Sequence, residues 1–244
     1  MRHHPLLSAL ALGALLLALT ACGPSAQTLE IHVQDAAGDT PVAAQVALGG
    51  RELTAKSAGR YEATVEPGDY ALVISAAGYV TARSAVTVAK DQAPEPLSVA
   101  LEPRRLEGLV RDAVTDAPVA DVTLVLGAAS AQSGADGAYS LPARESTSLS
   151  ATARGYLARE WAAAELDALF SIDGVQLAPL ELELEPRMLA GRVTESGSDA
   201  PLAGIRVSVG AVTAETDADG RYELRYVEPG ESLVVVSAAH RPLD

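Results

Sequence analysis

Short stretches of alternating apolar and polar residues dominate this chain. Ile205, Val207 and Val209 alternate with polar residues, and the pattern recurs over residues 122–126 and 180–184. A period of two turns one face of a strand toward a core and the other toward water. Because turns rich in Asp, Gly and Pro separate these stretches, the pattern predicts an all-β fold built from sandwiches.

Sequence motifs recur with an offset of 83 residues. Residues 106–110 read LEGLV, and residues 189–193 read LAGRV. Two further pairs of segments match at the same offset without a gap: 116–119 with 199–202, and 136–139 with 219–222. A fixed offset over several motifs is the signature of an internal repeat. A more divergent first copy precedes these two, and its closing strand, residues 97–101, returns as residues 180–184.

We therefore divide the chain after residue 27 into copy one (28–103), copy two (104–186) and copy three (187–244). Copy three has no counterpart of the last two strands of copy one. A sandwich without them is expected to have an open sheet edge and to expose inner-face residues such as Val207 and Val235. A truncated sequence, a strand donated by a partner and a marginally stable third copy would each explain this, and we favour truncation or marginal stability.

The order of motifs within a copy resembles the carboxypeptidase regulatory-like domain. The order is Gly-x-Val, Asp-x-Pro, Asp-x-Asp-Gly-x-Tyr, Pro-Gly and Ala-Gly-Tyr, with its clearest forms at residues 216–222, 78–79 and 155–156. The resemblance covers nearly all of residues 28–244 and implies tandem seven-stranded transthyretin-like β-sandwiches, the third incomplete. Copy one departs most, because no Asp precedes Gly59, and a PEGA-type sandwich is an alternative for it.

The first 27 residues resemble the export signal of a bacterial lipoprotein. An apolar run too short to span a membrane ends in Leu-Thr-Ala-Cys, with the only cysteine of the chain at Cys22. The resemblance implies a signal peptide over 1–21, lipidation of Cys22 and a tether over 22–27. Stable attachment to a membrane requires more than one acyl chain, which such processing supplies. By resemblance to the sorting rule of enteric bacteria, Gly23 in place of Asp implies the outer membrane rather than the inner membrane.

Composition excludes several functions. A formal net charge of -14 argues against binding to nucleic acid, whose phosphates require a basic surface. A single cysteine excludes an intramolecular disulfide and a thiolate metal site. The sequence contains no zinc-ligand pair, Gly-x-Ser-x-Gly elbow or phosphate-binding loop. We therefore expect a protein that is not an enzyme and needs no cofactor or metal.

Two kinds of feature, the Asp-Gly turns and the single tryptophan, are candidate sites. Asp217 to Gly220 lacks the spacing of a calcium loop, so we interpret it, like Asp136-Gly137, as a hairpin turn before a strand with a buried tyrosine. Trp161, the only tryptophan, lies in an alanine-rich insertion, 159–170, of helix-forming composition. It is a candidate platform for a sugar ring, although we favour a helix or loop that closes the domain edge.

The function expected from these patterns is that of a lipid-anchored cell-envelope protein. Its sandwiches would act as a spacer, an adhesion unit or a module that binds envelope proteins. A carbohydrate-binding lipoprotein is the alternative, because starch-binding modules have a similar fold, and this analogy concerns fold alone.

Overall fold

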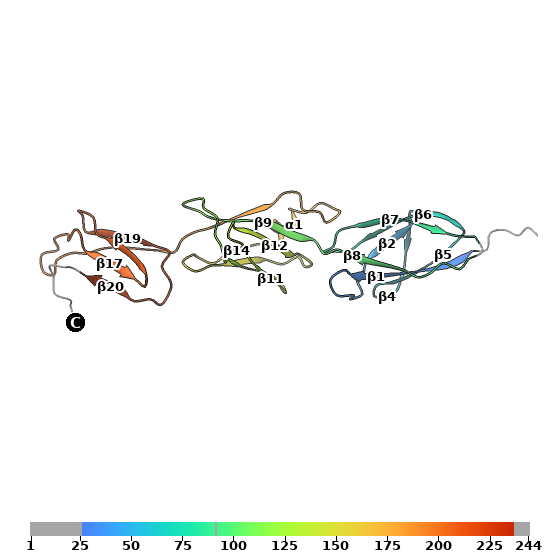
Figure 1. Ribbon diagram of the computed structural model, residues 1–244, viewed down its shortest axis with the longest axis horizontal. Helices are drawn as coiled ribbons and strands as arrows, with labels where there is room; N and C mark the ends of the chain where they lie inside the picture. Colours follow the sequence, from blue (N-terminus) through green and yellow to red (C-terminus); the bar gives the residue numbers. More distant parts are fainter. Residues whose placement is uncertain (1–25, 91, 237–244) are drawn as a thin grey trace, which may run out of the picture.

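The computed structural model describes residues 26–90 and 92–236, and the leader with Cys22 lies outside this range. Within it, strands β1 to β20 and one short helix build three sandwiches that follow one another along a line (Figure 1). Copy one lies at one end of this line and copy three at the other. The all-β architecture predicted from alternation is confirmed.

Copy one is a sandwich of two four-stranded sheets. The first has the order β4-β5-β1-β8 and the second the order β3-β2-β6-β7. The strand bounds are β1 Gln27–Asp35, β2 Gln45–Leu48, β3 Arg51–Leu53, β4 Ala55–Ser57, β5 Arg60–Val65, β6 Gly68–Ser75, β7 Ala82–Val88 and β8 Leu97–Leu101. The last strand, β8, pairs parallel to the first, β1.

Copy two has the same plan with seven strands. Its sheets have the orders β12-β9-β15 and β11-β10-β13-β14, and β15 again pairs parallel to the first strand, β9. The bounds are β9 Arg105–Asp112, β10 Thr123–Leu126, β11 Ala129–Gln132, β12 Ala138–Pro142, β13 Leu149–Thr152, β14 Arg159–Trp161 and β15 Leu180–Leu184, with helix α1 over Ala163–Asp167.

Copy three contains five strands within the described residues. β16 pairs with β19, and the other sheet has the order β18-β17-β20. The bounds are β16 Met188–Arg192, β17 Arg206–Val209, β18 Val212–Glu215, β19 Arg221–Arg225 and β20 Leu233–Val236. Val235 is 45% exposed, as expected for an open edge, but the same prediction for Val207 is wrong, because its side chain is fully buried. Val207 lies on the central strand β17, where both neighbouring strands and the opposite sheet cover it.

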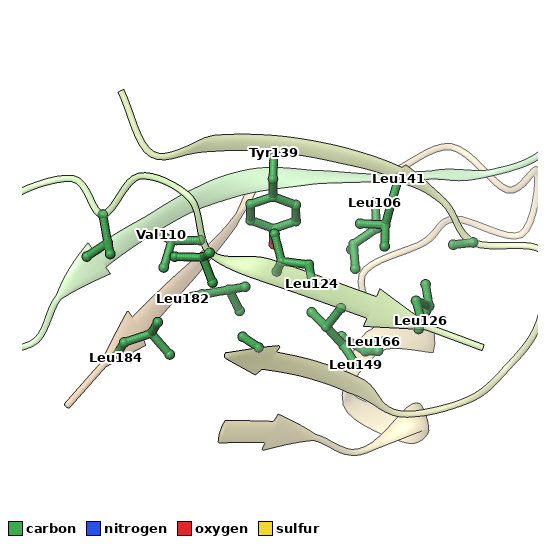
Figure 2. Close-up of a cluster of buried hydrophobic side chains, with 14 residues drawn as sticks. Leu106, Val110, Leu124, Leu126, Tyr139, Leu141, Leu149, Leu166, Leu182 and Leu184 are labelled. Carbon is green, nitrogen blue, oxygen red and sulfur yellow. The ribbon is translucent and has the colours of Figure 1, made fainter. Parts of the chain in front are cut away.

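The inner faces of each pair of sheets form a separate hydrophobic core. Figure 2 shows the core of copy two, where leucines from β9, β10, β12, β13 and β15 surround the ring of Tyr139. The hydroxyl of Tyr139 donates a hydrogen bond to the carbonyl of Leu180 at 3.1 Å. Tyr61 is equally buried in copy one, and its hydroxyl donates to the carbonyl of Ala44 at 2.6 Å. Each ring is thus buried while its polar end is satisfied.

The turns before these tyrosines differ in part from the predicted hairpins. Gly137 and Gly220 have φ values of 77° and 72°, as the turn requires. However, the strands on either side of each turn belong to opposite sheets, so the turns cross the sandwich instead of closing a hairpin. A Cβ at Gly137 would lie 2.5 Å from the carbonyl oxygen of Val110, because the turn packs directly on the first strand of its copy.

The insertion of copy two is less helical than its composition predicts. Residues 159–161 form strand β14, and only residues 163–167 are helical, with Leu166 buried in the core. Pairing of β14 with β13 competes with helix formation and prevails at the start of the segment. None of the helices in the described part of the chain has the length and apolar character needed to cross a bilayer.

Candidate functional site: the domain junctions

Among the described residues, the only buried charged side chains are Asp35 and Asp112. Each is the last residue of the first strand of its copy, and each lies opposite the last residue of the parallel closing strand. A buried carboxylate is costly unless it is hydrogen-bonded or paired with a cation. The partners of the two aspartates come partly from the following copy, so these residues mark the two domain junctions.

At junction one, between copies one and two, Arg144 of copy two binds both oxygens of Asp35 through one edge of its guanidinium. Its Nε lies 2.7 Å from Oδ2 of Asp35, and its Nη2 lies 3.2 Å from Oδ1. From copy one, the Tyr79 hydroxyl donates to Oδ2 at 2.8 Å and the Ala37 amide donates to Oδ1. A two-pronged contact of this kind fixes orientation as well as distance.

At junction two, between copies two and three, the hydroxyl of Tyr226 occupies the place of the arginine. It donates to Oδ2 of Asp112 at 2.8 Å, and Tyr156 of copy two donates to the same oxygen at 2.9 Å. The amides of Val114 and Thr115 both donate to Oδ1 at 2.8 Å. The rings of Tyr156 and Tyr226 meet edge to face with centroids 5.4 Å apart, a favourable geometry.

These contacts keep both carboxylates ionised. The hydrogen bonds from Arg144 hold the pKa of Asp35 well below its ordinary value. Burial alone would raise the pKa of Asp112, but its hydrogen bonds from two amides and two tyrosine hydroxyls lower it to about 2. Hydrogen bonds to the charged form favour that form. Neither carboxylate can therefore exchange a proton with a substrate near neutral pH, and both act as fixed acceptors.

One linker residue connects the backbones of neighbouring copies at each junction. The amide of Arg104 donates to the carbonyl of Gly78 at 2.9 Å, and its carbonyl accepts from the amide of Ala143 at 2.7 Å. At junction two, the amide of Arg187 donates to the carbonyl of Gly155 at 2.8 Å, and its carbonyl accepts from the amide of Val227 at 3.2 Å. The chain between copies is therefore bonded on both sides and does not act as a loose linker.

Glycine permits the close approach of the next copy. Gly78 has a φ of 82°, and a Cβ there would lie 1.9 Å from the carbonyl oxygen of Arg144. Gly155 has a φ of 77°, and its Cβ would lie 2.9 Å from Cβ of Tyr226. Each Gly-Tyr pair thus supplies an open surface and a hydroxyl donor to the same contact.

At junction one, residues 167–174, which continue from the end of the insertion, form a strap that reaches copy one. The carbonyl of Asp173 accepts from the amide of Thr81 at 2.8 Å, and its carboxylate lies 2.9 Å from Arg83. Arg104 stacks over the ring of Phe170 at 4.5 Å and pairs with Asp167 at 3.3 Å. At junction two, the described residues form one ion pair between the copies, Arg154 with Glu228 at 3.2 Å, which is exposed and therefore weak.

Comparison with family models matches residues 28–102 and 188–241 to the carboxypeptidase regulatory-like domain. The matches cover more than half of the chain. The chain belongs to the carboxypeptidase regulatory-like domain family. Copy two, which carries the insertion, lies outside the matched ranges, although its strands repeat the order of copy one. A comparison with the curated proteins finds no match.

Solved structures similar to this carboxypeptidase regulatory-like chain include the Bacillus anthracis TIE protein, with 14% identity and a TM-score of 0.42. That match covers 88% of this chain but 46% of the other, so this chain spans less than half the length of the protein it matches. A streptococcal ancillary pilin matches at 9% identity and a TM-score of 0.33, covering 87% and 96% of the two chains. The Bacillus cereus major pilin subunit BcpA matches at 11% identity and a TM-score of 0.31, and the match covers 88% of this chain and 89% of the pilin.

Two hallmarks of the carboxypeptidase regulatory-like pattern, Gly78-Tyr79 and Gly155-Tyr156, belong to the junctions. Sequence reasoning used them to recognise the family and missed their role between copies. It also missed Asp35 and Asp112, which occupy the same place after Val33 and Val110. Their recurrence was visible in the sequence, but the residue of the next copy that binds each aspartate was not.

In this carboxypeptidase regulatory-like protein, Trp161 is not among the hydrogen-bond partners that the structure gives for the junction carboxylates. Cys22 lies outside the described residues, and its lipidation stays a prediction. Trp161 ends strand β14, is partly buried against the core of copy two, and has the Arg159 guanidinium 5.0 Å above its ring. A sugar that stacked on this face would have to displace Arg159.

The Asp217 turn uses its carboxylate for backbone hydrogen bonds. Oδ1 accepts from the amides of Asp219 at 2.9 Å and Arg221 at 2.8 Å. In the parts of the chain that the structure describes, no three His, Cys, Asp or Glu side chains gather into a metal-binding group. The local contacts of Asp217 are those of an Asx turn.

Proposed function

We propose that this protein is a non-catalytic spacer of the cell envelope, attached to a membrane through lipid on Cys22. The observation that carries the proposal is the repeated junction, in which a buried aspartate of one sandwich is bound by a side chain of the next. A protein that maintains a fixed distance needs domains whose relative orientation is set. Without such contacts, flexible domain motion is the default expectation.

The arrangement of the copies supports the attachment. Copy one begins at β1, whose first residue, Gln27, follows Cys22 by five positions. The three sandwiches then extend in a line from that end (Figure 1). A lipid at Cys22 would hold copy one near the membrane and place copy three farthest from it. The outer membrane is the favoured location, on the basis of Gly23.

Distance measurements between copies one and three test the spacer function. Spin labels on Ala85→Cys and Thr213→Cys, in a Cys22→Ser background, report the separation of exposed positions on β7 and β18. We expect one narrow distance distribution by double electron–electron resonance, and a broader one when Asp35 and Asp112 are both replaced by alanine. A broad distribution in the protein with both aspartates intact would contradict the proposal.

Membrane attachment has a separate test. Cys22→Ser should leave the precursor without lipid and uncleaved by the lipoprotein peptidase, and labelling with radioactive palmitate should be lost. Fractionation of the unsubstituted protein should recover it with outer membranes. If the variant, after losing its signal, still partitions into detergent as the unsubstituted protein does, the lipid anchor is wrong.

A further inference from the structure

A hollow of about 620 Å³ opens at the end of copy one that faces copy two. Its floor comes from the residues before β2 and after β6, whose ends are paired there, and its rim includes the tip of the strap. Ligand sites of this size occur preferentially at domain interfaces. The hollow is therefore complete only when copies one and two are docked at junction one.

The strap holds an apolar side chain in a fixed position on the rim. The amide of Ser171 donates to the carbonyl of Val175 at 2.9 Å, which closes the tip into a tight turn. A Cβ at Gly174 would lie 2.2 Å from the carbonyl oxygen of Tyr79, so the tip rests directly on copy one. Ile172, at the tip, lines the hollow and is 100% exposed. A ligand in the hollow would cover this side chain.

The walls of the hollow combine methyl groups with uncharged polar side chains. Five alanines supply most of the apolar surface. The side chains of Gln45, Ser75 and Thr81 also line it, and none of them has a hydrogen-bond partner among the described residues. These side chains can both donate and accept hydrogen bonds. A purely apolar ligand would leave them without partners, which is costly.

Charge in the hollow is already balanced. Among the described residues that line it, none is Asp or Glu, and Arg104 carries the only charge. The guanidinium of Arg104 pairs with Asp167 and stacks over Phe170, and its side chain is 15% exposed. A charged ligand would lose water without gaining an unpaired partner of opposite charge. The ligand that fits is therefore uncharged.

The backbone around the hollow has few groups left to offer. The amide and the carbonyl of Ala44 are both bonded to the Tyr61 hydroxyl, at 2.9 and 2.6 Å. The carbonyl of Ala76 accepts from the amide of Tyr79, and that of Gly78 accepts from the amide of Arg104. An extended peptide gains its affinity from backbone hydrogen bonds, so this arrangement disfavours a peptide. The free polar groups are those of side chains.

We propose that the hollow at junction one binds a neutral sugar. A sugar ring presents hydroxyl groups that can pair with Gln45, Ser75 and Thr81, and C–H faces that can pack on the alanines and on Ile172. The site is distinct from Trp161, which does not line the hollow. Because the ligand would contact copy one and the strap together, it would also stabilise the docking of copies one and two.

Three neutral disaccharides are the probes: maltose, cellobiose and N,N′-diacetylchitobiose. Each is added at up to about 20 mM to the full chain carrying Cys22→Ser, a range that detects a millimolar dissociation constant. Amide signals are followed by NMR. At least one disaccharide should shift the signals of Ala44, Ser75 and Ile172 together and saturably, while signals at junction two stay unchanged.

Two variants with matched controls test the assignment. Ile172→Ser should raise the dissociation constant roughly fivefold through lost apolar contact, and the fold is unaffected because this side chain is fully exposed. Leu177→Ser, also exposed on the segment after the strap but outside the hollow, should leave binding unchanged. Thr81→Val, which keeps the shape and removes the hydroxyl, should weaken binding, whereas Thr64→Val should not.

Four results would overturn the proposal. They are the absence of saturable shifts with all three disaccharides, shifts centred on Trp161, unchanged binding in both Ile172→Ser and Thr81→Val, and stronger shifts of the same amides by the uncharged peptide acetyl-Ala-Leu-Ala-amide. The last result would assign the hollow to a peptide. Binding is measured separately from the distance between copies one and three, so failure of the sugar site leaves the spacer function standing.

Discussion

Asp35 and Asp112 occupy equivalent places but receive different partners. At junction one, a guanidinium neutralises the carboxylate, whereas at junction two four uncharged donors surround it. The partners also differ in their position relative to the residue that bonds the linker. Arg144 follows Ala143, whose amide donates to Arg104, whereas Tyr226 precedes Val227, whose amide donates to Arg187. Tyr226 has a φ of 64°, a strained conformation for a residue with a side chain. We therefore expect junction two to be the weaker of the two.

Acid should open junction two before junction one. The folded-state pKa of Asp112 is about 2, below its ordinary value of 3.8, so its stabilising contribution is complete above pH 3.8 and is lost as the pH falls toward 2. The pKa of Asp35 is lowered further, so junction one should persist to lower pH. Tyrosine ring signals of Tyr156 and Tyr226, followed by NMR between pH 5 and pH 2 (approximate limits set by these pKa values), measure the transition.

Asp112→Asn is the control for this titration. The amide remains uncharged at every pH, so the change in the tyrosine signals over this range should disappear. If the signals of the unsubstituted protein change first near pH 5 or above, the lowered pKa of Asp112 is wrong.

Gly78→Ala should separate copies one and two without disrupting the core of either. The new Cβ would lie 1.9 Å from a backbone oxygen of Arg144, which cannot move independently of copy two. Gly50→Ala is the matched control, because Gly50 has a similar φ of 80° and a Cβ there would have no atom within 4 Å. Both variants should lower the free energy of unfolding by roughly 1 kcal/mol through backbone strain. In calorimetry, copies one and two should unfold in a single transition in the unsubstituted protein and in Gly50→Ala, and in two separate transitions only in Gly78→Ala.

Strands could be predicted from alternation because one buried and one exposed face impose it on each strand. The sheet that each strand joins could not be predicted, because both sheets bury the same kinds of residue. The turns at Gly137 and Gly220 show this: their conformation follows from Asp-Gly chemistry, but the crossing between sheets depends on long-range pairing. Residues 159–170 show the same limit, because β13 recruits their first residues into a sheet.

Gly137→Val and Gly220→Val should each destabilise their own copy by about 1–3 kcal/mol. At both positions a Cβ would lie within 2.5 Å of a backbone oxygen on or next to the first strand of the copy, in addition to the strain of positive φ. Gly197→Val is the control in copy three, because Gly197 also has a positive φ but a Cβ there would meet no neighbouring atom within 4 Å. Urea unfolding of the three variants measures the difference, and equal effects at Gly220 and Gly197 would show that the packing beside β16 is unimportant.

The three copies differ most in how much core each one buries. The described core cluster of copy two contains fourteen buried residues and that of copy one eleven, whereas that of copy three contains four. The sequence predicted this inequality, because the motifs of the last two strands were absent from copy three. It did not predict the junctions, since they depend on contacts between copies that no motif within one copy encodes.

Limited proteolysis should therefore remove copy three first. Copies one and two should survive as one block, held by junction one and the strap, while cleavage begins after about residue 187. Mass spectrometry of the fragments over time measures the order. Equal resistance of all three copies in a monomer would contradict the expectation of a less stable third copy.

The parallel pairing of β1 with β8, and of β9 with β15, governs how copies one and two respond to tension. The first and last strands of each copy lie side by side and run in the same direction over five paired positions. A pull along the chain slides these strands past each other and loads their evenly spaced hydrogen bonds together. Breaking them one after another would require less force. Copies one and two are therefore loaded in shear by such a pull, which is the geometry that resists extension best.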